Sequence, residues 1–93
     1  MTEIHNAKIL VVGTSGGLGS AISRDLAARG ARLALSGRSA VRLGAIGVES
    51  AVFVIADLRD PGAAEQIVAQ AEEQLGGLNV VVYVAGVVAF GAI

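Results

Sequence analysis

Short apolar runs alternate with amphipathic stretches along this chain. Runs rich in Val, Ile, Leu and Ala predict strands at residues 8–12, 32–36, 50–56 and 78–85. Apolar residues at three- and four-residue spacing predict helices at residues 18–29, 39–44 and 61–75. Strands that are apolar at consecutive positions are typical of parallel sheets covered on both faces. The alternation therefore indicates consecutive βαβ units.

The two longer helices carry recognisable end signals. Gly30 and Gly76 are the expected stops, because glycine is favoured just after a helix. Asp60 is the expected N-cap of the last helix, and Pro61 suits its first position. The residues expected on the buried faces are Leu18, Ile22 and Leu26 in the first helix and Ala64, Ile67, Val68, Ala71 and Leu75 in the last.

These elements predict the fold class α/β, a partial Rossmann domain. The expected sheet is doubly wound and parallel, with strand order 3-2-1-4 and flanking helices. Residues 1–93 are expected to form a single incomplete domain from which the later strands of such a sheet are absent. Strand residues 78–84 contain no charge and no proline, so they predict an apolar edge that pairs with another chain or with a missing C-terminal half.

Composition excludes several classes of function. The chain has no cysteine and one histidine, His5, which is expected in a solvated leader, so no disulfide and no metal site are predicted. A net charge of −1 and only one Tyr and two Phe argue against nucleic acid as a partner. No apolar run approaches the roughly 20 residues of a membrane span, and the first residues do not resemble a signal peptide. No membrane association and a cytoplasmic location are therefore expected.

A glycine-rich turn joins the first strand to the first helix. Here backbone N–H groups can approach a phosphate because no Cβ intervenes, and the helix N-terminus adds partial positive charge. The residues expected to bind a pyrophosphate are Gly13, Ser15, Gly16, Gly17, Leu18 and Gly19. The alternative is a glycine-rich turn that binds nothing.

The spacing of this turn resembles that of the short-chain dehydrogenase/reductase family. The pattern Gly13-x3-Gly17-x-Gly19 matches the three glycines of the classical Thr-Gly-x3-Gly-x-Gly motif, although Val12 replaces the threonine. Gly16 also satisfies the spacing of the family's extended branch. Near the C-terminus, Ala85 and Gly86 resemble the second half of the family's Asn-Asn-Ala-Gly motif, which favours the classical branch and implies cofactor contacts there.

The end of the second strand indicates which dinucleotide is preferred. No acidic residue is present where one would bind the ribose hydroxyls of NAD, and Arg38 stands there instead. An arginine can pair with a ribose phosphate through two charge-assisted hydrogen bonds, and Ser39 can add a hydroxyl. The sequence therefore favours NADP(H) over NAD(H). The alternative is that Arg38 is a solvated surface residue.

Asp57 and Leu58 follow the third strand and have two interpretations. The resemblance implies that they lie at the adenine edge, where the carboxylate accepts a hydrogen bond from the exocyclic amino group. Equally, Asp57 can stabilise a turn through its own side chain.

The resemblance implies an oxidoreductase that transfers hydride between a nicotinamide and a carbonyl or alcohol. The family's catalytic Ser, Tyr and Lys would lie beyond residue 93, so no catalytic residue is expected here, and this chain alone is predicted to be inactive. The expected role is the NADP(H)-binding segment of such an enzyme. The alternative is an inert nucleotide-binding fragment or a degenerate Rossmann piece that self-associates.

Overall fold

The computed structural model describes residues 4–13 and 16–84. It contains every strand and helix that the sequence predicts, with small differences in length. In chain order these are β1 (Lys8–Val12), α1 (Gly17–Ala28), β2 (Arg32–Gly37), α2 (Ala40–Ala45), β3 (Val52–Ile55), α3 (Ala63–Leu75) and β4 (Val80–Tyr83). Strands β3 and β4 are shorter than predicted, because hydrogen bonding in the sheet covers only part of each apolar run.

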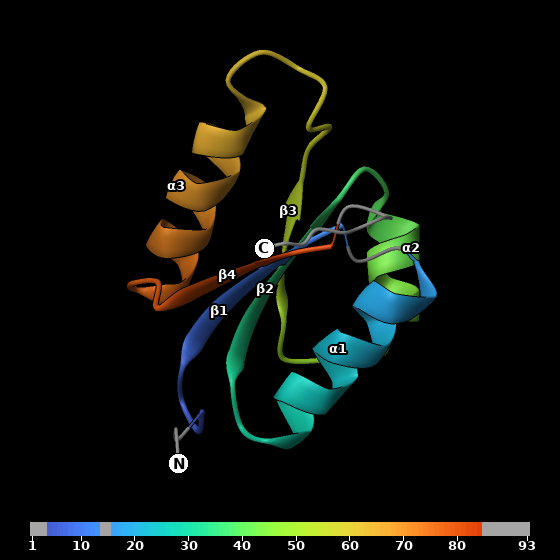
Figure 1. Cartoon of the computed structure of the whole chain (residues 1–93), viewed down its shortest axis with the longest axis vertical. Helices are drawn as coiled ribbons and strands as arrows, with labels where there is room; N and C mark the ends of the chain where they lie inside the picture. The colour runs from blue at the N-terminus through green and yellow to red at the C-terminus, as the bar shows by residue number, and fades with distance from the viewer. Residues whose placement is uncertain (1–3, 14–15, 85–93) are drawn as a thin grey trace.

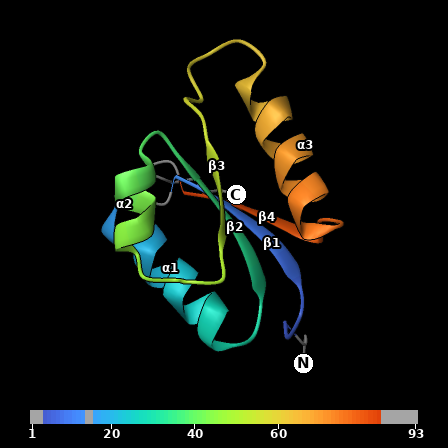
Figure 2. The same cartoon turned by 180° about the vertical axis from the view of Figure 1, so that it is seen from behind.

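The four strands form one parallel sheet in the order β3-β2-β1-β4, as predicted. Strand β1 is central, and Leu10 lies opposite Ala34 of β2 and Val81 of β4. Helices α1 and α2 cover one face of the sheet and α3 covers the other (Figures 1 and 2). The chain thus has three layers, which explains why its strands are apolar at consecutive positions.

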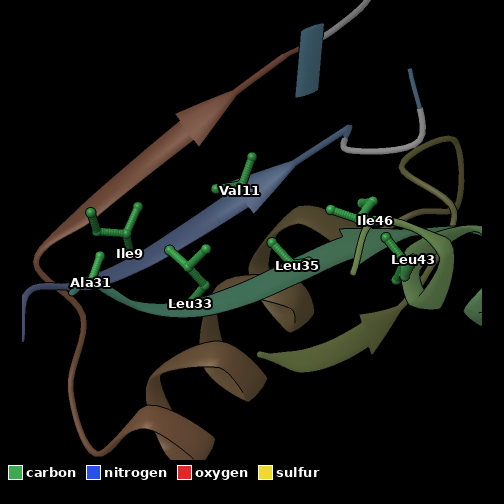
Figure 3. Packing of buried hydrophobic residues seen from close by; sticks show 7 residues of the cluster. All are labelled: Ile9, Val11, Ala31, Leu33, Leu35, Leu43 and Ile46. Atoms are coloured by element: carbon green, nitrogen blue, oxygen red, sulfur yellow. The ribbon is translucent and has the colours of Figure 1, made fainter. Parts of the chain in front are cut away.

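Each face of the sheet has its own buried cluster. Successive side chains of a strand point to opposite faces. The cluster beneath α1 and α2 consists of Ile9, Val11, Ala31, Leu33, Leu35, Leu43 and Ile46 (Figure 3). The cluster beneath α3 consists of Leu10, Val12, Ala34, Val54, Ile67, Ala71 and Leu75. Strands β1 and β2 place side chains in both clusters, so these two strands link the two halves of the core.

The predicted buried face of α1 is wrong at its first residue. Leu18 is 66% exposed, whereas Gly19 and Ser23 are buried. The Ser23 hydroxyl donates a hydrogen bond of 2.8 Å to the Gly19 carbonyl, so this buried polar group is satisfied within the helix. Small residues at these two positions suit close packing of the first turns on the sheet, and Leu18 is turned outward.

The predictions for α3 need two corrections. Asp60 is not the N-cap, because the helix begins after Gly62, which has a φ of 76° and completes a turn in which the Ala63 N–H donates to the Asp60 carbonyl. The buried face is Ala63, Ile67, Ala71 and Leu75, at strict four-residue spacing. Ala64 and Val68 are exposed, because the face of α3 that contacts the sheet is narrower than the apolar face predicted from the sequence. The predicted stop at Gly76 is confirmed.

Strand β4 is the least covered strand. Val80, Val81 and Tyr83 are 46%, 48% and 61% exposed, and among the described strands β4 pairs with β1 alone. The helices lie over the other three strands, so apolar side chains of β4 face solvent. His5 is exposed as predicted, but its imidazole lies so close to Gly30 that a Cβ there would overlap it.

Residues 4–13 and 16–84, which the structure describes, contain neither a membrane-spanning helix nor a metal-binding cluster. In this part of the chain no helix is long and apolar enough to cross a bilayer. The same residues bring together no group of three or more His, Asp or Glu side chains able to hold a metal ion.

The α3 contacts predict unequal effects of two neighbouring truncations. Ile67→Ala removes a side chain that is 1% exposed and should lower the free energy of unfolding by about 2–5 kcal/mol. Val68→Ala trims an exposed side chain and should cost less than about 1 kcal/mol, with alanine's better helix propensity offsetting the loss. Urea unfolding followed by circular dichroism measures both; equal losses would show that α3 packs through a different face.

Candidate functional site

A crevice opens where the sheet's strands end. It is lined by Val12, Gly13, Ser36, Gly37, Arg38, Ala56, Asp57, Leu58 and Arg59, and its volume is about 370 Å³. These residues end or follow β1, β2 and β3, whose carboxyl ends lie at the same edge because the strands are parallel. Doubly wound sheets bind their ligands at this edge.

Gly13 forms the inner end of the crevice. Its N–H donates to the Ser36 carbonyl at 3.1 Å, which extends the β1–β2 pairing one residue beyond the strand. The φ of Gly13 is +85°, and a Cβ would overlap the carbonyl oxygen of Val84. The backbone of Val84, directly after β4, therefore requires glycine at position 13. The close approach of a phosphate would be a second reason for glycine here.

The N-terminus of α1 carries no side-chain cap. Its N-cap, Gly16, makes no side-chain capping bond, and the first helical hydrogen bond runs from the Ser20 N–H to the Gly16 carbonyl at 3.0 Å. The N–H groups of residues 17–19 thus have no acceptor within the helix, and no acidic residue lies in the first turn. A Cβ on Gly16 or Gly17 would meet no described atom within 4 Å. No steric contact with the described residues therefore requires glycine at either position.

Other residues of the predicted phosphate turn occupy different environments. Gly19 is buried in α1, and the side chain of Leu18 is exposed beside the open N-terminus. Ser15 lies outside the described residues, as do Ala85 and Gly86. The predicted contacts of these three residues therefore stay predictions.

Arg38 lies on the rim of the crevice, directly after β2. It is exposed, and no hydrogen bond or ion pair joins its guanidinium to another residue of the described ranges. The neighbouring Gly37 carbonyl accepts the Ala56 N–H at 3.0 Å, so the backbone on either side of the rim is held by sheet hydrogen bonds. A free, always charged guanidinium on this rim suits an anionic ligand.

Ser39 has a structural role that the sequence alone did not assign. It is the N-cap of α2, and its Oγ accepts the Arg42 N–H at 3.3 Å. It does not line the crevice, although its hydroxyl proton is not used by this bond. The predicted contribution of Ser39 to a ribose phosphate is untested.

Asp57 stabilises a turn, which was one of its two interpretations. Its Oδ1 accepts the backbone N–H of Arg59 at 2.9 Å, and its carboxylate is bonded to the Arg59 guanidinium, with 2.7 Å between Nη2 and Oδ2. The side-chain and backbone hydrogen bonds from Arg59 lower the pKa of Asp57 to about 2. Asp57 is thus ionised at neutral pH, and its predicted adenine contact stays a prediction, as does that of Leu58, which also lines the crevice.

Sequence reasoning missed Arg59 as a residue of the site. Its side chain lines the crevice and forms the ion pair with Asp57. The available signal was the spacing Asp-x-Arg directly after a strand, where a turn brings the third residue back towards the first.

The chain matches the family described as short chain dehydrogenase over residues 7–93. It is 36% identical over 86 residues to a hydroxysteroid 11-beta-dehydrogenase 1-like protein of Xenopus tropicalis, an alignment that covers 85% of this chain and 30% of that protein. It is 35% identical over 92 residues to the L-rhamnose 1-dehydrogenase (NAD(P)(+)) of Azotobacter vinelandii, covering 88% of this chain and 36% of the relative.

A solved structure shares the fold. The short chain dehydrogenase from Burkholderia cenocepacia J2315, crystallised in complex with NADP, superimposes with a TM-score of 0.82 and 35% identity. The match covers 99% of this chain and 40% of that one. The chain thus spans about a third of the length of these curated relatives and corresponds to their N-terminal part.

The contrast between Gly13 and Gly17 leads to a prediction about folding. Gly13→Ala should destabilise the chain by at least about 2 kcal/mol, because the new Cβ overlaps the Val84 carbonyl and the backbone is left-handed. Gly17→Ala places its Cβ in open space at a helical position and should change stability by less than about 1 kcal/mol. Thermal unfolding compares the two variants; similar melting temperatures would contradict the packing role of Gly13.

Proposed function

The chain belongs to the short-chain dehydrogenase/reductase family, and we propose that it is the NADP(H)-binding segment of a cytoplasmic oxidoreductase. In the complete protein the bound nicotinamide would accept or deliver a hydride at an alcohol or carbonyl carbon. The residues of this chain bind and orient the dinucleotide, and none of them is assigned a catalytic role.

The observation that carries the cofactor preference is the position of Arg38. Its guanidinium lies on the rim of the crevice without a partner among the described residues, at the place where an NAD-binding protein of this fold carries an acidic residue. A 2′-phosphate bound there would gain charge-assisted hydrogen bonds. The NADP complex of the Burkholderia relative supports this choice, while the Azotobacter relative, named for NAD(P)(+), is compatible with either cofactor.

The open N-terminus of α1, which follows the turn after Gly13 in the chain, supports pyrophosphate binding. Gly16 and Gly17 leave space for an oxyanion to approach the N–H groups of residues 17–19. Gly13, directly after β1, has a φ of +85°, in the region that glycine favours. These features would hold the diphosphate, while Arg38 would favour a ribose that carries a 2′-phosphate over one that does not.

Titration with both cofactors tests this proposal. The chain should bind NADPH more tightly than NADH, and Arg38→Ala should weaken NADPH binding by about 1–3 kcal/mol while leaving NADH nearly unchanged. Arg42→Ala, which removes an exposed arginine of the neighbouring helix outside the crevice, is the matched control and should alter neither. Isothermal calorimetry gives all six affinities, and equal losses for the two cofactors in Arg38→Ala would refute the assignment.

A second candidate function is self-association through β4, with or without nucleotide. The observation that favours it is the exposure of Val80, Val81 and Tyr83 on a strand that pairs, among the described strands, with β1 alone. A second copy could cover this edge, as could the following part of a longer protein. The tail at residues 87–93, which was also expected to take part, lies outside the described residues.

Charge at the strand tests this association. Replacing Val81 and Tyr83 together by lysine should convert a dimer or larger assembly to monomers, because both side chains are exposed and like charges would meet across a paired edge. Val41→Lys, at a position that is 83% exposed on α2, is the control and should leave the assembly intact. Sedimentation velocity provides the readout, and a wild-type chain that is a stable monomer at high concentration would contradict the proposal.

A further inference from the structure

Two arginine–aspartate ion pairs occur among the described residues, and they differ in location and in the number of hydrogen bonds. Asp25 lies on α1 and Arg29 is the C-cap of that helix, with 3.2 Å between Nε and Oδ2, and both side chains are more than 60% exposed. Arg59 and Asp57 lie two residues apart on the rim of the crevice. A single-contact surface pair contributes little to stability. The second pair is more extensively bonded and lies at the site.

The Arg59–Asp57 pair uses the whole carboxylate. Besides the contacts of the backbone N–H and of Nη2, the Arg59 Nε lies 3.1 Å from Oδ1 and 3.2 Å from Oδ2. Each oxygen of Asp57 thus accepts two hydrogen bonds from one residue, which accounts for the roughly four acceptor positions of a carboxylate. The Asp57 side chain is 27% exposed and that of Arg59 is 77% exposed, so the arginine covers the acid from the solvent side.

This pair matters for an anion bound at Arg38. Asp57 and Arg38 line the same crevice, and the charge of Arg38 adds to the lowering of the Asp57 pKa, although less than the bonds from Arg59 do. An ionised carboxylate on this rim repels a phosphate bound nearby. Asp57 is ionised at neutral pH, so a cation bonded to it reduces the repulsion that a phosphate at Arg38 would meet.

We propose that Arg59 is a specificity-determining positioning residue, which favours a 2′-phosphorylated dinucleotide by neutralising and fixing Asp57 beside Arg38. The inference rests on the proposed function, since it assigns the cofactor preference of that crevice to two arginines instead of one. Arg38 contacts the phosphate, and Arg59 acts through Asp57. With its charge neutralised by Arg59, the Asp57 carboxylate can lie on the same rim as a bound 2′-phosphate.

A double-mutant experiment on the full chain tests this role with NADPH and NADH as probes. Arg59→Ala should weaken NADPH binding about five- to tenfold and change NADH binding by less than about twofold, since only NADPH brings a phosphate near the exposed charge of Asp57. In an Asp57→Asn background the same change should cost NADPH less than about twofold. Arg59→Lys keeps the charge and should retain NADPH affinity within about threefold of wild type.

Arg29→Ala is the matched control, because it breaks the other arginine–aspartate pair away from the crevice and should leave both affinities unchanged. Circular dichroism confirms that each variant is folded. An Arg59→Ala variant with wild-type NADPH affinity would overturn the inference while leaving the proposed function intact. An equal NADPH loss in both backgrounds would also overturn it, since Arg59 would then contact the phosphate directly. A wild-type chain that prefers NADH or binds neither cofactor would overturn both proposals.

Discussion

The pairing of β1 along both of its edges is the constraint on which the candidate site depends. Val12 lies opposite Ser36 on one side and Tyr83 on the other, and hydrogen bonds from Gly13 and Val84 continue this pairing past the strand. Since all four strands are parallel, their carboxyl ends are brought to one edge of the sheet. The crevice lies at this edge and is lined by residues that end or follow β1, β2 and β3.

The two-sided core keeps that edge in place. Alternate side chains of β1 and β2 enter the two clusters, so displacement of either strand would disturb the packing of helices on both faces. Helix α1 lies against the sheet with Gly19 and Ser23 buried, and it begins close after the carboxyl end of β1. The open amide groups of α1 and the charged rim are thus positioned by apolar packing elsewhere in the chain.

The charges of the rim are arranged so that one carboxylate does not cancel the positive character of the site. Asp57 is held by Arg59 through four hydrogen bonds, and Arg38 is left without a partner among the described residues. The net charge of the three groups is positive. An ion pair of this exposure contributes little to stability, so its consequence for ligand electrostatics is larger than its consequence for folding.

The sequence by itself determined the order and type of the elements, the strand order and the glycine-rich turn, because these depend on local periodicity, end signals and the handedness of βαβ crossovers. Only the tertiary structure decided which side of a helix is buried and what each site residue contacts. Leu18 and Val68 fit an apolar stripe but face solvent, and Gly13 is confined by Val84, 71 residues away along the chain. Arg59 is recognised as a residue of the site only from the turn that places it against Asp57. The helix faces and the confinement of Gly13 depend on how elements distant in sequence approach one another, which periodicity and spacing do not encode. The Arg59–Asp57 contact is local and depends on the conformation of one turn.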